Sequence, residues 1–282
     1  MIARAFGASG PPVPVIGQGT WNVPVRGTAR DEAIRALRAG IELGMTHIDT
    51  AEMYGDGAAE SLVGDAIADV PRDRLFLVSK VLPSNASFRG TIRACENSLR
   101  RLRTDYLDCY LLHWRGGEPL AETMRALETL VADGKIRALG VSNFDVADLR
   151  EAQAALTRER IACNQVLYHL GERTIEEHEV PYCREHGIAV VAYTPFGRGD
   201  FSDAAGAREL ERIAVAHGVT AHAVILAFLT RDDGTFAIPK ASDLAHVRAN
   251  AAAGDVRLSA AEIAAIDRAF PARRRRGGLP TL

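Results

Sequence analysis

The sequence contains few cysteines and no long hydrophobic run. Its four cysteines are widely spaced and form no Cys-x-x-Cys pair: Cys95, Cys109, Cys163 and Cys183. This spacing indicates buried, reduced thiols rather than a disulfide framework or a zinc site. No apolar run approaches the ~18 residues that a membrane helix needs, and the amino-terminal residues lack the apolar core of a signal peptide. We therefore expect a cytoplasmic protein without a membrane partner.

Neither sign of charge dominates, and no interior linker, low-complexity tract or tandem repeat divides the chain. The 34 Lys and Arg residues nearly balance 36 Asp and Glu, which argues against a broad surface for nucleic acid. Because α/β barrels of ~200–250 residues fold as one domain, we expect a single domain over residues 1–282. Within it, residues 1–15 are predicted to form a hairpin at the barrel floor. Residues 271–282, which include Arg273–Arg276, are predicted to form a flexible tail.

Short apolar runs alternate with segments of helical period along the whole chain. The predicted strands are 16–20, 45–49, 75–80, 106–113, 136–143, 162–166, 188–193 and 235–240. Runs that are apolar throughout are buried on both faces, and a helix after each one is typical of a parallel sheet. One helix is predicted from Phe88 to Leu102, and helix starts with capping boxes are predicted at Ser259 and Thr174. The pattern favours an α/β fold of the (β/α)₈ TIM-barrel type.

Each apolar run ends in a polar residue or a glycine, at the strand end where a barrel places its reactive groups. These residues are Gly19, Thr20, Asp49, Lys80, His113, Ser142, Asn143, Gln165, Tyr193 and Lys240. Asp49, Lys80 and His113 end three consecutive strands, and adjacent strands lie only ~5 Å apart. We therefore expect these three side chains to meet, joined by Tyr54 from the loop after Asp49.

These four side chains form a coherent proton-donating group. A free tyrosine has a pKa near ~10, and the ammonium group of Lys80 would lower the pKa of Tyr54 by stabilising the phenolate. The Asp49 carboxylate would keep Lys80 charged, and a neutral His113 could orient a carbonyl oxygen. The set predicts protonation of an oxyanion as it forms, but it supplies no electron source.

Seven segments carry a resemblance to a known family. They are DTAEMYG (49–55), LFLVSK (75–80), YLLHW (110–114), GVSNF (140–144), NQVLYH (164–169), AYTPFGRG (192–199) and IPKAS (238–242). In this order the chain resembles the aldo-keto reductases over nearly its whole length. The resemblance implies that Asp49, Tyr54, Lys80 and His113 form the catalytic tetrad, with Tyr54 as general acid. It also implies a nicotinamide dinucleotide that gives hydride to the substrate carbonyl carbon.

The resemblance further implies a set of cofactor contacts. Residues expected at the nicotinamide and pyrophosphate are Gly19, Thr20, Ser142, Asn143, Gln165, Tyr193, Pro195, Phe196, Gly197 and Arg198. Residues expected at the adenosine end are Lys240, Ser242, His246 and Asn250. His246 stands where many members have an arginine against the 2′-phosphate, and Ala249 where an acidic residue often precedes the asparagine. Because Lys240 is present and Arg248 is close in sequence, NADPH is favoured over NADH.

Three large side chains follow strand ends and are predicted to form the substrate pocket: Trp21, Met53 and Trp114. The expected substrates are small aldehydes, ketones or 2-oxo-aldehydes such as methylglyoxal, reduced to alcohols by a monomeric enzyme. His47 and Asp49 form a His-x-Asp pair, but the other histidines are scattered, so no metal site is expected. Gly17-x-Gly19 lacks the third glycine of a dinucleotide fingerprint and is read as a tight turn.

Two alternatives remain open from the sequence. The potassium-channel β subunits share the fold and hold a nicotinamide nucleotide while acting mainly as partners, so a binding module is one alternative. A barrel isomerase or lyase that forms a Schiff base at Lys80 is the other. The tail could also act as a lid over the pocket.

Overall fold

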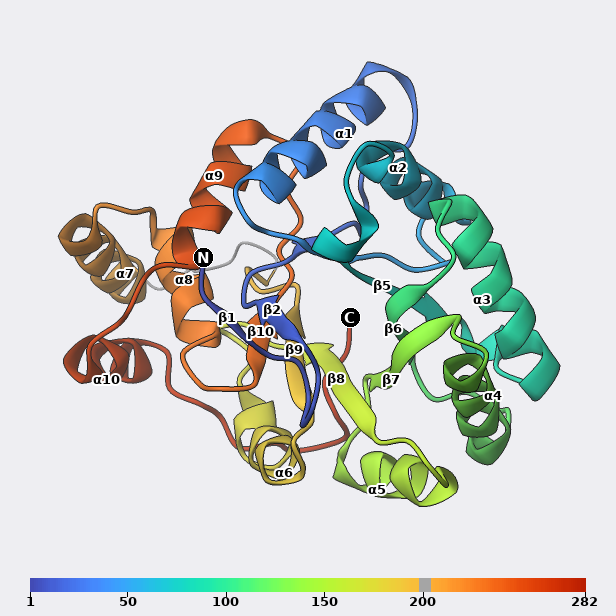
Figure 1. Cartoon of the computed structure of the whole chain (residues 1–282). Coiled ribbons are helices and arrows are strands. Elements are labelled where there is room, and N and C mark those ends of the chain that lie inside the picture. Colours follow the sequence, from blue (N-terminus) through green and yellow to red (C-terminus); the bar gives the residue numbers. More distant parts are fainter. Residues whose placement is uncertain (198–203) are drawn as a thin grey trace.

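The computed structural model describes residues 1–197 and 204–282 as one parallel barrel surrounded by helices (Figure 1). Its eight-stranded sheet has the order β10-β9-β8-β7-β6-β5-β4-β3, so neighbouring strands are consecutive in sequence. The strands are β3 (Gln18–Gly19), β4 (His47–Asp49), β5 (Phe76–Val81), β6 (Leu107–Leu112), β7 (Ile136–Ser142), β8 (Ile161–Leu167), β9 (Ala189–Tyr193) and β10 (Thr235–Ala237). The (β/α)₈ prediction is confirmed, and each predicted strand run contains one observed strand or most of it.

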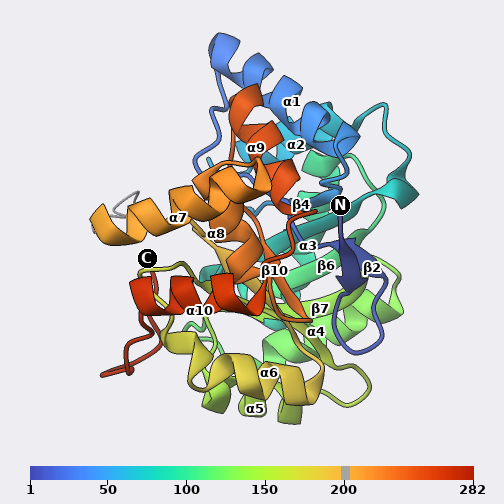
Figure 2. The same ribbon diagram turned by 90° about the vertical axis from the view of Figure 1, so that its left-hand side faces the viewer.

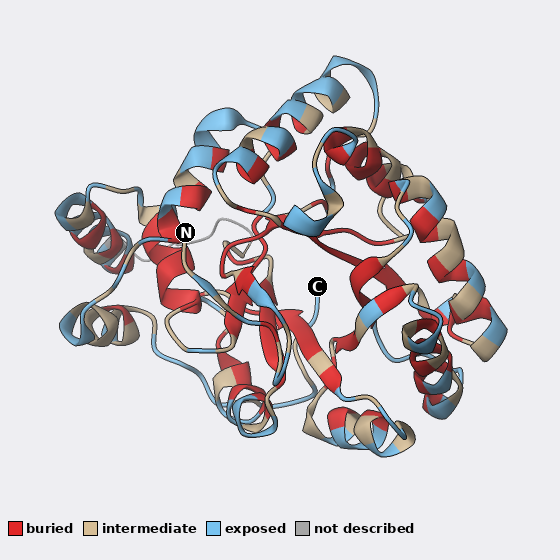
Figure 3. Ribbon diagram, viewed as in Figure 1, coloured by how far each residue is buried: buried red, intermediate tan, exposed pale blue. Residues whose placement is uncertain are grey.

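In the described part of the chain, one α-helix follows each of the strands β3 to β8, two follow β9 and two follow β10, and together they cover the outside of the sheet (Figure 1). They are α1 (Gly27–Glu42), α2 (Ala58–Ile67), α3 (Phe88–Leu102), α4 (Leu120–Ala132), α5 (Val146–Ala155), α6 (Glu179–His186), α7 (Ala204–His217), α8 (Ala221–Leu229), α9 (Leu244–Ala253) and α10 (Ala260–Ala269). Buried residues line the strands and the inner helix faces, while the outer helix faces are exposed (Figure 3).

Backbone hydrogen bonds close the sheet into a barrel. Ile16 forms a parallel bridge with Ala237, and the Gly17 N–H donates to the Ala237 carbonyl at 2.8 Å. At Gly19, an added Cβ would lie 2.6 Å from the Ile238 carbonyl oxygen, so this seam requires a glycine. Closure brings the ends of β3 and β10 together, which places both near the same rim.

The amino-terminal hairpin covers one end of the barrel, as predicted. Strands β1 (Ala3–Ala5) and β2 (Pro12–Pro14) pair antiparallel, and between them Phe6 inserts into the barrel. The Phe6 ring lies 4.6 Å from that of Phe76 and 5.1 Å from that of Phe236, measured between ring centroids. Figure 2 shows β2 and the carboxyl terminus at opposite ends of the barrel.

Local signals in the sequence had mixed outcomes. Helix α3 spans the predicted residues, and the capping box of Ser259 with Glu262 is present at the start of α10. The capping box predicted at Thr174 is wrong, because residues 174–176 form a short 3₁₀ helix and the Thr174 hydroxyl donates to Glu172 instead. Thr174 is the first residue inside this short helix, and the cap position is occupied by Arg173, whose side chain makes no capping hydrogen bond.

Among the described residues, no single helix combines the length and apolar character needed to cross a membrane. The segments 205–217 and 221–229 meet those criteria only when taken together, and they are bent by 94° at the break between them.

Candidate active site

The predicted acid and lysine meet at the carboxyl ends of β4 and β5. Lys80 Nζ donates to Asp49 Oδ1 at 2.6 Å and to the Thr50 carbonyl oxygen at 2.8 Å. Lys80 is fully buried and Asp49 is 1% exposed. In the parallel register of β4 and β5 Asp49 lies opposite Val78. Lys80, two residues further along β5, points to the same side of the sheet, and its side chain reaches Asp49. The Asp49 oxygens accept hydrogen bonds from Lys80 and from Gln165, so the pair is an ammonium–carboxylate pair.

Tyr54 completes this group from the turn between β4 and α2. Two glycines with left-handed backbone, Gly55 (φ 58°) and Gly57 (φ 85°), allow the chain to turn sharply here. The Lys80 Nζ donates to the Tyr54 hydroxyl oxygen at 3.3 Å and lies 5.0 Å from the centre of its ring. The ammonium group therefore touches both the Asp49 carboxylate and the Tyr54 phenol.

The pKa of Tyr54 differs in direction from the sequence-based expectation. Burial raises the pKa of Tyr54 above its ordinary value, and this rise outweighs the lowering that Lys80 causes. The predicted contribution of Lys80 is present, but the predicted net decrease is wrong. Burial alone would lower the pKa of Lys80, yet Asp49 and Tyr54 together raise it. Tyr54 is consequently a neutral phenol beside a stable cation at neutral pH.

His113 faces Tyr54 across the end of β6. Its backbone N–H donates to the Val81 carbonyl oxygen at 3.0 Å, which fixes it beside the end of β5. The rings of His113 and Tyr54 are 5.7 Å apart between centroids and nearly perpendicular, at 74°. Burial and the charge of Lys80 lower the pKa of His113 to about 3, so the imidazole is neutral at pH 7.

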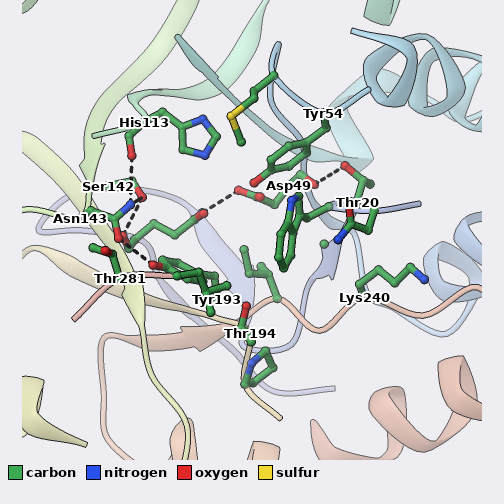
Figure 4. Close-up of a pocket in the computed structure, with 18 of the residues that line it drawn as sticks. Thr20, Asp49, Tyr54, His113, Ser142, Asn143, Tyr193, Thr194, Lys240 and Thr281 are labelled. Atoms are coloured by element: carbon green, nitrogen blue, oxygen red, sulfur yellow. Dashed lines mark hydrogen bonds between the residues drawn. The ribbon is translucent and has the colours of Figure 1, made fainter. Parts of the chain in front are cut away.

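A cavity of about 700 Å³ opens above these side chains (Figure 4). Its described lining residues include predicted catalytic, cofactor and substrate residues. They are Gly19, Thr20, Trp21, Asn22, Asp49, Met53, Tyr54, His113, Trp114, Arg115, Ser142, Asn143, Gln165, Tyr193, Thr194, Pro195, Phe196, Gly197, Ile238, Lys240, Thr281 and Leu282. Lys80 lies behind the wall, where it touches Asp49 and Tyr54.

Four of the predicted cofactor residues form one hydrogen-bonded cluster at the ends of β7, β8 and β9. Ser142 Oγ donates to the Gln165 carbonyl oxygen at 2.8 Å, and the Tyr193 hydroxyl donates to Asn143 Oδ1 at 2.8 Å. Asn143 Nδ2 donates to Ser142 Oγ and to the His113 carbonyl oxygen, both at 3.1 Å. Asn143 also has a left-handed backbone with φ 60°, a conformation that asparagine tolerates better than most residues. The cluster fixes the Tyr193 ring at the cavity wall.

The loop after β9 also lines the cavity. The Gly197 N–H donates to the Thr194 carbonyl oxygen at 2.9 Å, which forms a tight turn around Pro195 and Phe196. Thr194 has φ 50°, which is strained for a β-branched residue. Arg198, the remaining predicted residue of this loop, lies outside the described residues.

The predicted adenosine residues lie farther along the same rim. Lys240 is exposed at the cavity edge, and His246 is exposed in the first turn of α9. Ser242, His246 and Asn250 are absent from the cavity lining. The Ser242 hydroxyl is buried and has no hydrogen-bond partner among the described residues. A polar ligand atom reaching the start of α9 would satisfy it, so the residues fit an extended polar ligand.

The comparisons with known proteins agree with this geometry. Residues 15–270 match the family model described as the aldo/keto reductase family. The chain belongs to the aldo/keto reductase family. Methylglyoxal reductase YeaE of Escherichia coli strain K12 is 48% identical over 266 residues, which are 92% of this chain and 92% of that protein. Glyoxal reductase of Bacillus subtilis strain 168 is 37% identical over 239 residues, or 84% of this chain and 83% of that protein.

A solved structure gives the same result. The aldo-keto reductase from Klebsiella pneumoniae in complex with NADPH has a TM-score of 0.92 and 46% sequence identity, and the match covers 100% of both chains. This aldo/keto reductase is therefore an oxidoreductase, and the resemblance drawn from its motifs is confirmed.

Several lining residues of this aldo/keto reductase were not singled out from the sequence. They are Asn22, Arg115, Thr194, Ile238, Thr281 and Leu282. Thr194 lies within the motif AYTPFGRG and could have been found there, whereas Thr281 and Leu282 carry no sequence signal. They reach the cavity because the tail folds back: Arg275 Nη1 donates to buried Glu179 Oε1 at 2.7 Å, and the backbone of Leu282 hydrogen-bonds Tyr193.

Two further observations bear on the chemistry of this aldo/keto reductase. Among residues 1–197 and 204–282, no group of three or more His, Cys, Asp or Glu residues is arranged to hold a metal ion. Lys80 is fully buried, ion-paired and raised in pKa, and a protonated amine is not a nucleophile. These properties argue against the alternative in which Lys80 forms a Schiff base.

Proposed function

We propose that the protein reduces small aldehydes, ketones and 2-oxo-aldehydes to alcohols with NADPH, and that Tyr54 is the general acid. The observation that supports this most directly is the contact of the Tyr54 hydroxyl with Lys80 Nζ at 3.3 Å, on the wall of the cavity. When bound, NADPH supplies a hydride to the carbonyl carbon. The carbonyl oxygen then develops negative charge, and Tyr54 gives it a proton.

The electrostatics of Tyr54 suit an acid that is used once in each turnover. Burial raises its pKa, so the phenol keeps its proton at neutral pH until a stronger base appears. A developing alkoxide is a stronger base than a phenolate, so the proton transfer is downhill. Lys80 then stabilises the phenolate left behind, because its ammonium group already donates to that oxygen.

His113 positions the carbonyl oxygen in this proposal. With its pKa lowered to about 3 the ring is neutral, so it donates one hydrogen bond and does not compete as an acid. Its Nδ1 is buried without a partner among the described residues, so the proton is best placed on Nε2. A substrate oxygen held between Nε2 and the Tyr54 hydroxyl would receive both hydrogen bonds.

The residues proposed to hold NADPH follow the rim of the cavity. Tyr193 would stack against the nicotinamide, and Ser142, Asn143 and Gln165 would face its carboxamide. Both N–H groups of Asn143 are already used within the protein, so its remaining capacity is as an acceptor. At the far end, Lys240, His246 and the Ser242 hydroxyl, which has no partner among the described residues, would meet the additional phosphate of NADPH. The NADPH bound by the Klebsiella pneumoniae relative supports this choice over NADH.

The mouth of the cavity supports small and varied substrates. Trp21 and Trp114 line it, and they remain 45% and 38% exposed, so the opening is wide and apolar. Met53 adds a flexible apolar wall. The methylglyoxal and glyoxal reductases among the relatives support 2-oxo-aldehydes as the first substrates to test.

We also propose that the protein acts in the cytoplasm as a monomer, without nucleic acid or a membrane as partner. Four buried free cysteines support a reducing compartment, since Cys109 and Cys163 lie 3.9 Å apart between sulfurs without a bond. The balanced charge supports the absence of a nucleic-acid surface. Light scattering of the purified protein measures its molar mass and so tests whether it is a monomer. A mass twice that of the chain would contradict this proposal.

Tyr54→Phe tests the proposed function. The variant keeps the ring but has no proton to give, so we expect kcat for methylglyoxal to fall by roughly 10²–10⁴-fold. NADPH should still bind, and more tightly than NADH, as measured by quenching of protein fluorescence. Retention of most carbonyl reduction by Tyr54→Phe would refute the role of general acid.

A further inference from the structure

The side chain of Gln165, from β8, hydrogen-bonds the Asp49 carboxylate of the proposed catalytic group. Its side chain is 2% exposed and its Nε2 donates to Asp49 Oδ2 at 2.7 Å. The other carboxylate oxygen, Oδ1, accepts from Lys80 at 2.6 Å. Each oxygen of the buried carboxylate thus has its own donor, and the two donors come from strands on different sides of the barrel.

The orientation of the Gln165 amide follows from chemistry. A carboxylate only accepts hydrogen bonds, so the NH₂ group must face Asp49 and the amide oxygen must face elsewhere. None of the hydrogen bonds among the described residues uses Gln165 Oε1, and Gln165 lines the cavity. A cofactor amide can therefore meet Oε1 while Nε2 continues to hold Asp49.

Loss of the hydrogen bond from Gln165 to Asp49 would weaken the contact of the Lys80 ammonium group with the Tyr54 oxygen. A buried carboxylate oxygen without a donor is costly, and two responses would relieve it. Asp49 could rotate to engage Lys80 with both oxygens, or it could take the Lys80 proton. Either response draws positive charge away from the Tyr54 oxygen, which now lies 3.3 Å from Lys80 Nζ.

We propose that Gln165 is a positioning residue for proton transfer, because it holds one oxygen of Asp49 so that Lys80 stays charged and in contact with Tyr54. This inference rests on the proposed role of Tyr54 as general acid. The titratable groups that face Asp49, Lys80 and Tyr54 are His47 from β4, His113 after β6, Cys163 from β8 and Tyr193 from β9. Of these, only the Cys163 thiol shares a strand with Gln165, and it remains protonated because its pKa is raised.

Gln165→Met is the main test, since methionine has a similar length and no donor. We expect kcat at saturating NADPH to fall about tenfold or more. The ionisation of Tyr54, followed by NMR of protein labelled with ¹³C at tyrosine Cζ and assigned with Tyr54→Phe, should move to higher pH by about one unit. The basic limb of the pH profile of kcat should move in the same direction.

Gln18→Met is the matched control. Gln18 is also buried, at 6% exposed, and its amide donates to the carbonyl oxygens of Leu37 and Met45 at 3.2 and 2.9 Å. Its substitution should lower thermal stability to a similar extent and leave the Tyr54 ionisation where it is. This separates a general packing defect from an effect on proton transfer.

Gln165→Glu provides a second variant should Gln165→Met fold poorly. A protonated glutamic acid still donates one hydrogen bond to Asp49, whereas its carboxylate does not, so kcat should approach the wild-type value only towards acidic pH.

Three outcomes would overturn the inference. They are a change confined to the NADPH dissociation constant, an unmoved Tyr54 ionisation in Gln165→Met, and a wild-type pH profile in Gln165→Glu. Failure of the general-acid role itself is recognised separately, because Tyr54→Phe would then retain turnover.

Discussion

Two buried histidines inside the barrel have the same electrostatics and different surroundings. Burial and the charge of Lys80 lower the pKa of both His47 and His113 to about 3. His113 lines the cavity beside Tyr54, whereas His47 packs at the floor with Phe6 and Phe76, at ring-centroid distances of 5.8 and 5.4 Å. A shifted pKa therefore does not by itself distinguish the histidine proposed for catalysis, and the position of His113 on the cavity wall is what separates it from His47.

Strand geometry explains why a histidine of the packed floor, His47, lies only two residues from Asp49 of the proposed catalytic group. Residues two apart on a strand point to the same side, so His47 and Asp49 of β4 both point into the barrel. Interior side chains of a barrel form layers, and these two belong to successive layers. The lower layer is sealed by the hairpin residue Phe6, and the upper layer opens to the cavity.

Matched substitutions of the two histidines give the largest contrast. His113→Leu removes the hydrogen bond proposed for the carbonyl oxygen, so we expect kcat for methylglyoxal to fall by about 100-fold. His47→Leu has a similar change in size and removes two ring nitrogens that have no partner among the described residues. Its kcat should remain within about twofold of wild type.

Steady-state kinetics of both variants, with circular dichroism to confirm folding, check this contrast. Equal losses of kcat would contradict it, because they would mean that both histidines act through the stability of the barrel.

Much of the upper layer could be predicted from the sequence. Parallel strands that are apolar throughout place their carboxyl ends at one rim, so Asp49, Lys80 and His113 had to lie near one another. The position of Tyr54 followed because its loop begins directly after Asp49. These inferences needed only strand order and spacing, which local sequence determines well.

Other features depend on contacts between distant parts of the chain. The net direction of the Tyr54 pKa depends on how deeply the phenol is buried, which strand order does not reveal. The bond between Gln165 and Asp49 joins residues 116 positions apart across the barrel. The return of the tail to the cavity depends on Arg275 meeting Glu179, a pair that no local pattern predicts.

A smaller effect is expected on the pH dependence of stability, because both histidines have a lower pKa in the folded protein than in the unfolded chain. Both are neutral in the folded protein down to about pH 3, whereas an unfolded histidine takes up a proton near ~6.5. Between these values the unfolded state binds more protons, so stability falls as the pH falls. Each histidine should contribute a slope of ~1.4 kcal/mol in unfolding free energy per pH unit.

Urea unfolding of wild type and His47→Leu at several pH values below neutrality measures this slope. The substitution should remove the contribution of one histidine to this slope below neutral pH, and it should leave the slope above pH 7 unchanged. A slope identical to that of wild type would mean that His47 is protonated in the folded protein.

The smallest expected effect is on KM, and it comes from the residues that border the two layers of the barrel interior. Phe6 closes the floor, whereas Leu282 lines the cavity and remains 52% exposed. Leu282→Ala should raise KM for a bulky aromatic aldehyde about threefold, equivalent to ~0.6 kcal/mol, because an apolar contact is lost. Methylglyoxal is too small to need that contact and should be unaffected. Leu43→Ala is the matched control, since Leu43 is 44% exposed and lies at the end of α1, away from the cavity. If both variants gave the same KM for the aromatic aldehyde, the tail would not contribute to substrate binding, and the upper layer alone would define the pocket.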